Sequence, residues 1–293
     1  MKILVTAANG QVGWELARQG ATSAHEVIAL DRQALDITSA EAISAIFNQH
    51  KPDLLINAAA YTAVDKAETD QDMAFAINRE GPKLLAEACR LADIPMLHIS
   101  TDYVFDGSQS GPYEESDPVA PLGVYGMSKW QGEEAVRHTL DKYIILRTAW
   151  VFGSHGNNFV KTMLRVGADR DELRVVDDQF GGPTSAAGIA AALLHIADQV
   201  GAYADVAWGT YHYSGQPFVN WHGFAVEIFR QARQLGIIQH DINVQAIPSS
   251  EYPTPAARPA NSRLSSDGLE KAFSIKADDW QLALQQMLAG MVS

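Results

Sequence analysis

The sequence of 293 residues contains a single cysteine, Cys89, so no disulfide can form within the chain. A lone thiol is typical of a protein that works in a reducing compartment. No apolar run approaches the about 18 residues that are needed to cross a bilayer, and the first residues lead directly into an apolar strand rather than a signal peptide. We therefore expect a cytoplasmic protein with no membrane partner.

Positive charge is also scarce, since 22 lysines and arginines stand against 35 aspartates and glutamates, a formal net charge of -13. A nucleic-acid-binding protein needs a basic face to displace counterions, so this balance argues against nucleic acid as a partner. The nine histidines show no metal-ligand spacing such as His-x-x-x-His. A small anionic ligand stays compatible with the composition, because local arginines and lysines can bind it.

Apolar residues make up 47% of the chain, and its length allows one large or two modest domains. Short apolar runs alternate with helical patterns from residue 2 to about residue 150. The expected strands span residues 2–6, 25–32, 52–60, 96–102 and 143–148. This alternation predicts an α/β fold with a Rossmann-type doubly wound parallel sheet.

The second half of the chain predicts a smaller C-terminal α/β domain that binds substrate. We expect the Rossmann domain to comprise residues 1–160 with returning segments within about 185–225. The smaller domain would comprise about 161–184 and 226–293. Within it, residues 247–263 are rich in Pro, Ser and Arg and predict a binding loop.

A tight glycine turn separates the first strand from the first helix. In Rossmann folds such a turn presents backbone N–H groups at a helix N-terminus to a dinucleotide pyrophosphate. Gly10 and Gly13 keep the close backbone approach and the packing of helix on strand. Ala7 stands where the first glycine usually lies, and alanine resists the positive φ that glycine adopts freely. The sequence therefore predicts dinucleotide binding, with a methyl group tolerated at residue 7 if the turn is not left-handed there.

Two residues at the end of the second strand give opposite indications of the coenzyme. Asp31 lies 18 residues after Gly13, about where an acid binds the ribose hydroxyls of NAD, whereas Arg32 suits the 2′-phosphate of NADP. NADH and NADPH therefore both stay open. Asp36 and Ile37 open the next helix and are assigned to the adenine edge, with a turn or cap role for Asp36 as the alternative.

Small or polar residues end the next two strands. Ala58, Ala59 and Ala60 let a flat ligand lie against the backbone at the carboxyl end of the third strand, which is the ligand-binding edge of open α/β sheets. Thr101 ends the fourth strand, where its hydroxyl can donate to a substrate oxygen or cap a turn. The sequence thus predicts that this edge carries both coenzyme and substrate.

Tyr125 and Lys129 are four residues apart, so both side chains project from one face if the segment is helical. A phenol with a pKa near ~10 is a weak acid at neutral pH, and a nearby ammonium group lowers that pKa by stabilising the phenolate. The pair then forms a proton donor suited to working pH. The spacing alone also fits a lysine stem packed over a tyrosine ring, but the polar strand end and the dinucleotide turn favour catalysis.

These motifs together resemble the extended short-chain dehydrogenase/reductases and, within them, the family of dTDP-4-dehydrorhamnose reductases. The motifs of the superfamily are the glycine turn, residues 57–60, residues 100–105 and the pair Tyr125 and Lys129. The more specific stretches are residues 63–68, 147–152, 156–159, 178–184 and 258–262. The resemblance covers essentially the whole chain.

The resemblance implies hydride transfer from NAD(P)H to the C4 ketone of dTDP-4-dehydrorhamnose, a dTDP-sugar, for the synthesis of rhamnose-containing polysaccharide such as O-antigen. By this resemblance Tyr125 donates the proton. Lys129 lowers the pKa of Tyr125 and binds the nicotinamide ribose, and Thr101 serves as a hydrogen-bond partner of the substrate oxygen or of Tyr125. It places at the sugar Asp102, Tyr103 and Trp150. It places at the coenzyme Gly10, Gln11, Val12, Asp31, Ala58, Ala59 and Ala60.

Arg258 is a candidate for the diphosphate of the substrate, because guanidinium groups match phosphate oxygens. Some relatives are described as magnesium-linked dimers, but the acids expected after the Pro183-Thr184 turn and at the C-terminus are absent here. We therefore assign no metal and expect a monomer or a homodimer. Two alternatives stay open: another sugar-nucleotide ketoreductase or epimerase of the superfamily, and a non-catalytic regulatory subunit with this fold.

Overall fold

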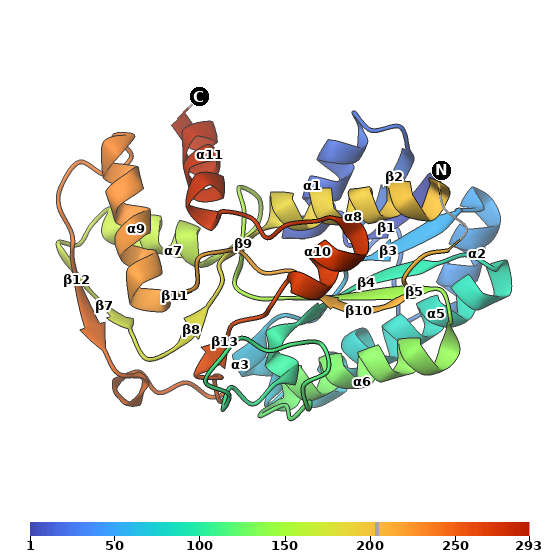
Figure 1. Cartoon of the computed structure of the whole chain (residues 1–293), viewed down its shortest axis with the longest axis horizontal. Coiled ribbons are helices and arrows are strands. Elements are labelled where there is room, and N and C mark those ends of the chain that lie inside the picture. Colours follow the sequence, from blue (N-terminus) through green and yellow to red (C-terminus); the bar gives the residue numbers. More distant parts are fainter. Residues whose placement is uncertain (203–204, 293) are drawn as a thin grey trace.

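A six-stranded parallel sheet forms the central layer of the computed structural model, which describes residues 1–202 and 205–292 (Figure 1). The strands lie in the order β10-β5-β4-β3-β1-β2, and each neighbouring pair is parallel. Their bounds are β1 Lys2–Thr6, β2 Glu26–Leu30, β3 Leu54–Asn57, β4 Met96–Thr101, β5 Tyr143–Thr148 and β10 Gly209–His212. The strand order reverses between β1 and β3, which confirms the predicted doubly wound sheet.

Side chains on the strands alternate between two apolar cores. In β1, Ile3 and Val5 belong to one core and Leu4 to the other. Helices α1 (Gln11–Gly20) and α8 (Ala186–Ala202) complete the first core. The second core is completed by α2 (Ala40–His50), α5 (Gly81–Ala92) and α6 (Val124–Thr139). Figure 1 shows α1 and α8 above the sheet and α5 and α6 below it. Because both faces are covered, the strands are continuously apolar in sequence.

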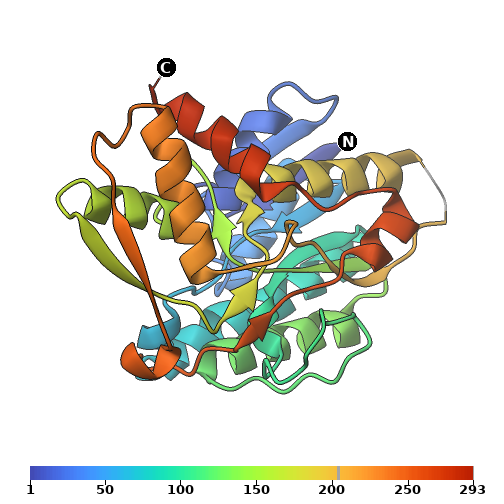
Figure 2. The same ribbon diagram turned by 60° about the vertical axis from the view of Figure 1, so that its left-hand side comes forward.

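A second group of elements packs beside the sheet around a third core. Its helices are α7 (Phe159–Gly167), α9 (Trp221–Gln234) and α11 (Trp280–Val292), and Figures 1 and 2 both place α9 beside α11. A two-stranded parallel sheet of β7 (Glu172–Val176) and β12 (Asn243–Ile247) packs against α9. Helix α10 (Asp267–Phe273) packs on β10 instead. The C-terminal part of the chain therefore contributes to both groups.

Short elements connect these layers. The two remaining sheets join β11 (Val219–Asn220), β8 (Phe180–Gly181) and β13 (Asn261–Ser262), and β6 (Val151–Phe152) with β9 (Thr184–Ser185). The short helical segments are α3 (Val64–Ala67), α4 (Gln71–Phe75), a π-helical turn η1 (Ala76–Glu80), and the 3₁₀ turns η2 (Asp102–Val104) and η3 (Ser249–Glu251). Among the described residues no helix combines the length and the apolar character needed to cross a membrane.

Candidate active site

The turn between β1 and α1 has the geometry of an anion-binding helix N-terminus. Ala7 adopts a φ of 57°, so the turn is left-handed at this residue, and the condition under which a methyl group is easily tolerated there is not met. The Gly10 N–H closes the turn by donating to the Ala7 carbonyl at 2.8 Å. A Cβ on Gly13 would lie 2.1 Å from the Ala7 oxygen, so only glycine fits there. Among the described residues no side chain caps α1, which leaves its first N–H groups, from Gln11 and Val12 onward, for a ligand.

A cavity of about 480 Å³ borders this turn, and both Asp31 and Arg32 line it. The Asp31 carboxylate accepts hydrogen bonds from the N–H groups of Gln33 and Ala34 and from Asn9 Nδ2, at 3.0 Å each. The carboxylate is thereby held in a fixed orientation at the end of β2. The two side chains that the sequence associates with opposite coenzymes thus lie at the same space.

Asp36 forms a turn through its side chain, and Ile37 packs into the apolar core. Asp36 Oδ1 accepts from the Thr38 N–H at 2.9 Å and from the Thr38 hydroxyl at 2.7 Å, and these bonds hold the pKa of Asp36 below its ordinary value. Ile37 is buried in the second core. Ser39 caps α2 by accepting from the Ala42 N–H. These contacts match the turn alternative for Asp36, and contact of either residue with adenine stays a prediction.

Two polar side chains that sequence reasoning missed hold the end of β3. The Thr6 hydroxyl donates to Asn57 Oδ1 at 2.6 Å and accepts from the N–H groups of Ala58 and Ala59 at 3.1 and 3.2 Å. These bonds satisfy the backbone where the strand ends, so the small side chains of Ala58, Ala59 and Ala60 are fixed at the sheet edge. The sequence did carry a signal for this contact, because Thr6 and Asn57 are polar residues at the ends of apolar strands β1 and β3.

Tyr125 lies on the buried face of α6, and Thr101 reaches it from the end of β4. The Thr101 hydroxyl lies near the Tyr125 phenol and favours its phenolate form. Burial raises the pKa of Tyr125 well above its ordinary value. The nearby Thr101 hydroxyl opposes this shift, and Asp102 and Tyr103 add to it. The sequence predicts a lowered pKa, so the direction differs, because in this geometry burial outweighs every stabilising contact of the phenolate.

Lys129 shares the buried face of α6 with Tyr125, as the spacing predicts. It is 2% exposed, and its ammonium donates to the Ile99 carbonyl at 2.7 Å. Burial lowers the pKa of Lys129 to about 8, and Glu133, one turn further along the helix, opposes that shift. Lys129 therefore keeps its charge at neutral pH on the same helix face as the phenol.

A buried ion-pair network that sequence reasoning missed lies behind Lys129. Glu133 is fully buried and accepts hydrogen bonds from Ser100 Oγ at 2.5 Å, Arg147 Nη2 at 2.7 Å and Arg137 Nη2 at 2.8 Å. Burial alone would raise the pKa of Glu133, but Arg147 and Arg137 hold it below its ordinary value. The network ties α6 to β4 and β5 and so fixes the strand end that carries Thr101. The sequence signal for this network was Glu133 itself, an acid four residues after Lys129 and so on the same helix face.

A second cavity, of about 370 Å³, is lined by residues from both groups of elements, among them Tyr103, Trp150 and Arg258. Trp150 stacks on Trp221 with ring centroids 3.6 Å apart and planes 13° from parallel. Arg258 Nη2 donates to Asp65 Oδ2 at 2.7 Å, while its Nη1 is buried without a partner among the described residues. The cavity thus has an aromatic wall and an arginine with a free donor. Sequence reasoning missed Trp221, which gives no signal beyond its place at a helix start.

Two of the residues predicted to bind substrate, Thr101 and Asp102, do not line this cavity. Asp102 follows Thr101 directly. It is 3% exposed, and Thr101 Oγ1 donates to its Oδ1 at 3.1 Å. Burial raises the pKa of Asp102 to about 6, which the hydroxyls of Ser262 and Thr101 oppose. The Asp102 carboxyl is therefore buried beside the Thr101 hydroxyl, outside the lining of the cavity.

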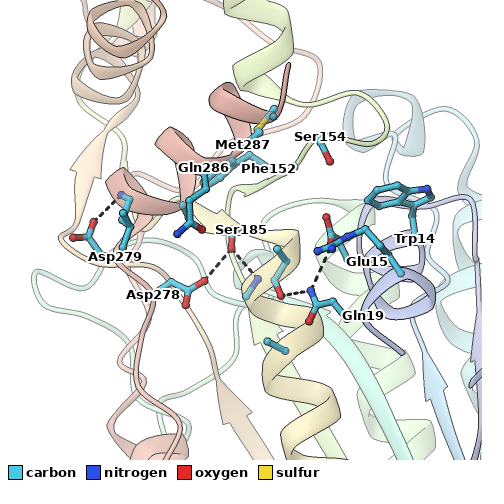
Figure 3. A pocket seen from close by; sticks show the side chains of 18 residues that line it. Trp14, Glu15, Gln19, Phe152, Ser154, Ser185, Asp278, Asp279, Gln286 and Met287 are labelled. Atoms are coloured by element: carbon cyan, nitrogen blue, oxygen red, sulfur yellow. Dashed lines mark hydrogen bonds and ion pairs between the residues drawn. The ribbon is translucent and has the colours of Figure 1, made fainter. Parts of the chain in front are cut away.

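A third cavity, of about 670 Å³, lies between α1, α8 and α11, and none of the predicted site residues is in its lining (Figure 3). Its polar groups bond to one another: Ser185 Oγ donates to Asp278 Oδ2 at 2.9 Å, and Arg18 Nη2 pairs with Glu15 at 2.7 Å. Within the described part of the chain no cluster of three or more His, Cys, Asp or Glu side chains could hold a metal.

Comparison with known proteins identifies the family. A family model described as "RmlD substrate binding domain" matches residues 1–293. The chain belongs to the RmlD family. A relative named dTDP-4-dehydrorhamnose reductase, from Aggregatibacter actinomycetemcomitans, is 46% identical over 98% of both chains. The predicted resemblance is thereby confirmed.

Two solved structures extend the RmlD family comparison to three dimensions. A dTDP-4-dehydrorhamnose reductase from Clostridium acetobutylicum superposes with a TM-score of 0.93, at 42% identity and with 100% of both chains covered. One from Bacillus anthracis, in complex with NADP, has a TM-score of 0.91, 34% identity and 99% coverage of both chains. The RmlD fold therefore extends over the sheet and over the second group of elements alike.

Proposed function

We propose that this chain reduces the C4 ketone of dTDP-4-dehydrorhamnose with NAD(P)H to give dTDP-L-rhamnose. The observation that carries the proposal is the burial of Tyr125 and Lys129 on one face of α6, with Thr101 near the phenol. Relatives named for this reaction match essentially the whole chain, which supports the substrate. The product would enter the synthesis of a rhamnose-containing polysaccharide, and we expect the enzyme to act in the cytoplasm as a monomer or homodimer.

The residues around the glycine turn fit a dinucleotide. The uncapped N-terminus of α1 suits a pyrophosphate at Gly10, Gln11 and Val12, and the neighbouring cavity at Asp31 and Arg32 suits the adenosine end. Ala58, Ala59 and Ala60 would lie along the coenzyme, and Lys129 would bind the nicotinamide ribose. When bound, the nicotinamide supplies the hydride that C4 receives.

Tyr125 supplies the proton that completes the reduction. Because burial raises its pKa, the phenol is protonated at neutral pH, and its proton passes to the C4 oxygen as the carbonyl becomes a hydroxyl. The charge on Lys129 then stabilises the phenolate that Tyr125 becomes, since both side chains lie on one face of α6. Thr101 provides the hydrogen bond that orients the phenol.

The cavity at Tyr103, Trp150 and Arg258 would take the sugar nucleotide. Its aromatic wall suits the flat faces of a sugar and a base, and the unpartnered Nη1 of Arg258 suits a diphosphate oxygen. The elements around the sheet would then hold the coenzyme, and residues of about 161–184 and 226–293 would supply most of the substrate wall. This division of the chain remains part of the proposal.

A coupled assay tests the proposal. The two preceding pathway enzymes supply the ketosugar, and absorbance follows the oxidation of NADH and of NADPH in separate reactions. A reductase consumes coenzyme in proportion to the sugar, whereas an epimerase retains it through turnover. If neither coenzyme is oxidised, the chain is not this reductase.

The Tyr125→Phe variant tests the assigned acid. Loss of the proton donor should lower kcat by about 100-fold or more, while the dissociation constant of the coenzyme stays close to that of the wild type. Tyr143→Phe, at the start of β5, is the matched control and should retain activity. Near-normal turnover of Tyr125→Phe would show that another group donates the proton.

A further inference from the structure

Helix α3 carries an acid that binds a segment from the far end of the sequence. Asp65 lines the same cavity as Arg258. Its Oδ2 accepts a hydrogen bond from Arg258 Nη2 at 2.7 Å, and its Oδ1 accepts one from the Ala256 N–H at 3.2 Å. These donors lie 191 and 193 residues further along the sequence. Both oxygens of one carboxylate therefore hold the segment of residues 253–259.

Residues 253–259 lie between η3 and β13 and belong to no helix or strand. Such a segment has no ladder of backbone hydrogen bonds, so its position depends on contacts with other elements. Thr254, Arg258 and Pro259 of this segment line the cavity that we assign to the sugar nucleotide. Asp65 thus holds one wall of that cavity in place.

The other end of α3 is attached to the helix that carries Tyr125. Glu68, which directly follows α3, accepts a hydrogen bond at Oε1 from the Val124 N–H at 2.9 Å. Val124 is the first residue of α6, and its N–H is one of those that a helix leaves without a partner of its own. Ala67 and Tyr125 are also buried in one apolar cluster. The α3 segment is therefore bound to the substrate wall through one acid and to the residue before the phenol through the other.

We propose that α3 and Glu68 form a brace that sets the position of the substrate wall relative to the Tyr125 phenol. The inference rests on the proposed function, which assigns the cavity to a sugar nucleotide and proton donation to Tyr125. Asp65 and Glu68 act through Arg258 and Val124, so they are positioning residues.

The charge of Asp65 also has an electrostatic effect of the opposite sign. A carboxylate at the wall of the cavity repels a diphosphate, whereas its hydrogen bonds hold the wall that the diphosphate contacts. The Arg258 guanidinium compensates the charge at 2.7 Å, and the Asp65 side chain is 44% exposed, so solvent screens what remains. We therefore expect the loss of the wall to outweigh the loss of repulsion.

The test measures the affinity for dTDP by isothermal titration calorimetry, which needs neither coenzyme nor turnover. Asp65→Ala removes both bonds and should weaken binding by about tenfold, whereas Asp65→Asn keeps an oxygen for the Ala256 N–H and should weaken it by about threefold. In an Arg258→Ala background, Asp65→Asn should cause no further weakening, because the ion pair is already absent. Lys66→Met breaks the other ion pair of α3, with Asp70, and is the matched control with unchanged affinity.

Turnover in the coupled assay separates the two ends of the brace. Asp65→Ala should raise the KM of the ketosugar by about tenfold, while the Kd of the coenzyme changes by less than about twofold. Glu68→Ala should instead lower kcat by about fivefold, because Val124 loses the acceptor that fixes it next to Tyr125. Glu68→Gln retains an acceptor oxygen and should recover most of kcat. The Tm of each variant should stay within about 3 °C of the wild type, since a half-exposed pair contributes little to stability.

Unchanged or tighter binding of dTDP by Asp65→Ala would overturn the inference, since the carboxylate would then only repel the ligand. A kcat of Glu68→Ala equal to that of the wild type would also overturn it. If Asp65→Ala does not fold, the cycle of Asp65→Asn with Arg258→Ala decides. A wild type that oxidises neither coenzyme would refute the proposed function, and the dTDP titrations would still decide whether Asp65 holds the wall. A wild type that does not bind dTDP would refute both.

Discussion

Replacing Glu133 by glutamine should destabilise the fold more than any other loss of a single charge in α6. Glu133 is fully buried, and it is the counterion of Arg147, which is 1% exposed and donates to it from Nε and Nη2. Glutamine removes the negative charge and leaves the Arg147 cation buried without compensation. Breaking a buried pair in this way costs about 3–5 kcal/mol. At about 2 °C per kcal/mol for a chain of this length, the Tm should fall by roughly 6–10 °C.

The assay is urea unfolding at pH 7, with thermal unfolding as a second probe. Glu134→Gln is the matched control, because this neighbour is half-exposed and pairs with the same Arg137. It should lose less than about 1 kcal/mol. The pKa of Glu133 lies below its ordinary 4.5, so its contribution is complete above that pH and is lost as the pH falls further. A loss below about 1 kcal/mol for Glu133→Gln would show that the buried charges do not stabilise each other as the geometry implies.

Two other predictions concern the coenzyme turn and the lysine. Ala7→Gly should raise the free energy of unfolding by about 0.5 kcal/mol, because a left-handed alanine costs about 1 kcal/mol and the freedom of glycine in the unfolded chain offsets part of the gain. Ala8→Gly is the control, because Ala8 does not have a positive φ, and it should lower the free energy of unfolding. If Ala8→Gly were stabilising and Ala7→Gly destabilising, Ala7 would not be strained. Since burial lowers the pKa of Lys129 to about 8, activity should fall as the pH rises through about 8, by about tenfold per pH unit above it. A rate that is constant to about pH 9.5 would show that the Lys129 charge is not needed.

Much of the fold could be predicted because local pattern encodes it. A strand buried on both faces must be continuously apolar, and its neighbours in the sequence must be helices that cover it, so the alternation from residue 2 to about 150 leaves little choice of topology. The spacing of Tyr125 and Lys129 likewise places them on one face of any helix, and the structure buries both on that face. The glycine turn is equally local, since Gly13 is required by the Ala7 carbonyl six residues earlier.

Distances between residues far apart in the sequence could not be predicted in this way. Asp36 and Ile37 stand beside a coenzyme strand in the sequence, yet their contacts are those of a turn and a core. Asp102 follows Thr101 directly, yet the start of η2 turns it away from the cavity that Tyr103 lines. Trp150 likewise stacks on Trp221. The two residues are far apart in the sequence, so a local pattern could not predict their contact.

The sequence by itself determined the class of protein, its glycine turn and the helix face that Tyr125 and Lys129 share, since each is encoded in a short motif whose geometry the backbone imposes. The tertiary structure alone decided the environment of those residues. It buried Tyr125 and so raised a pKa that the sequence predicts to be lowered, it placed Glu133 and Arg147 behind Lys129, and it buried the Asp102 carboxyl beside the Thr101 hydroxyl. The physical reason is that a pKa depends on every group within a few ångströms, and the chain brings those groups together only when it packs.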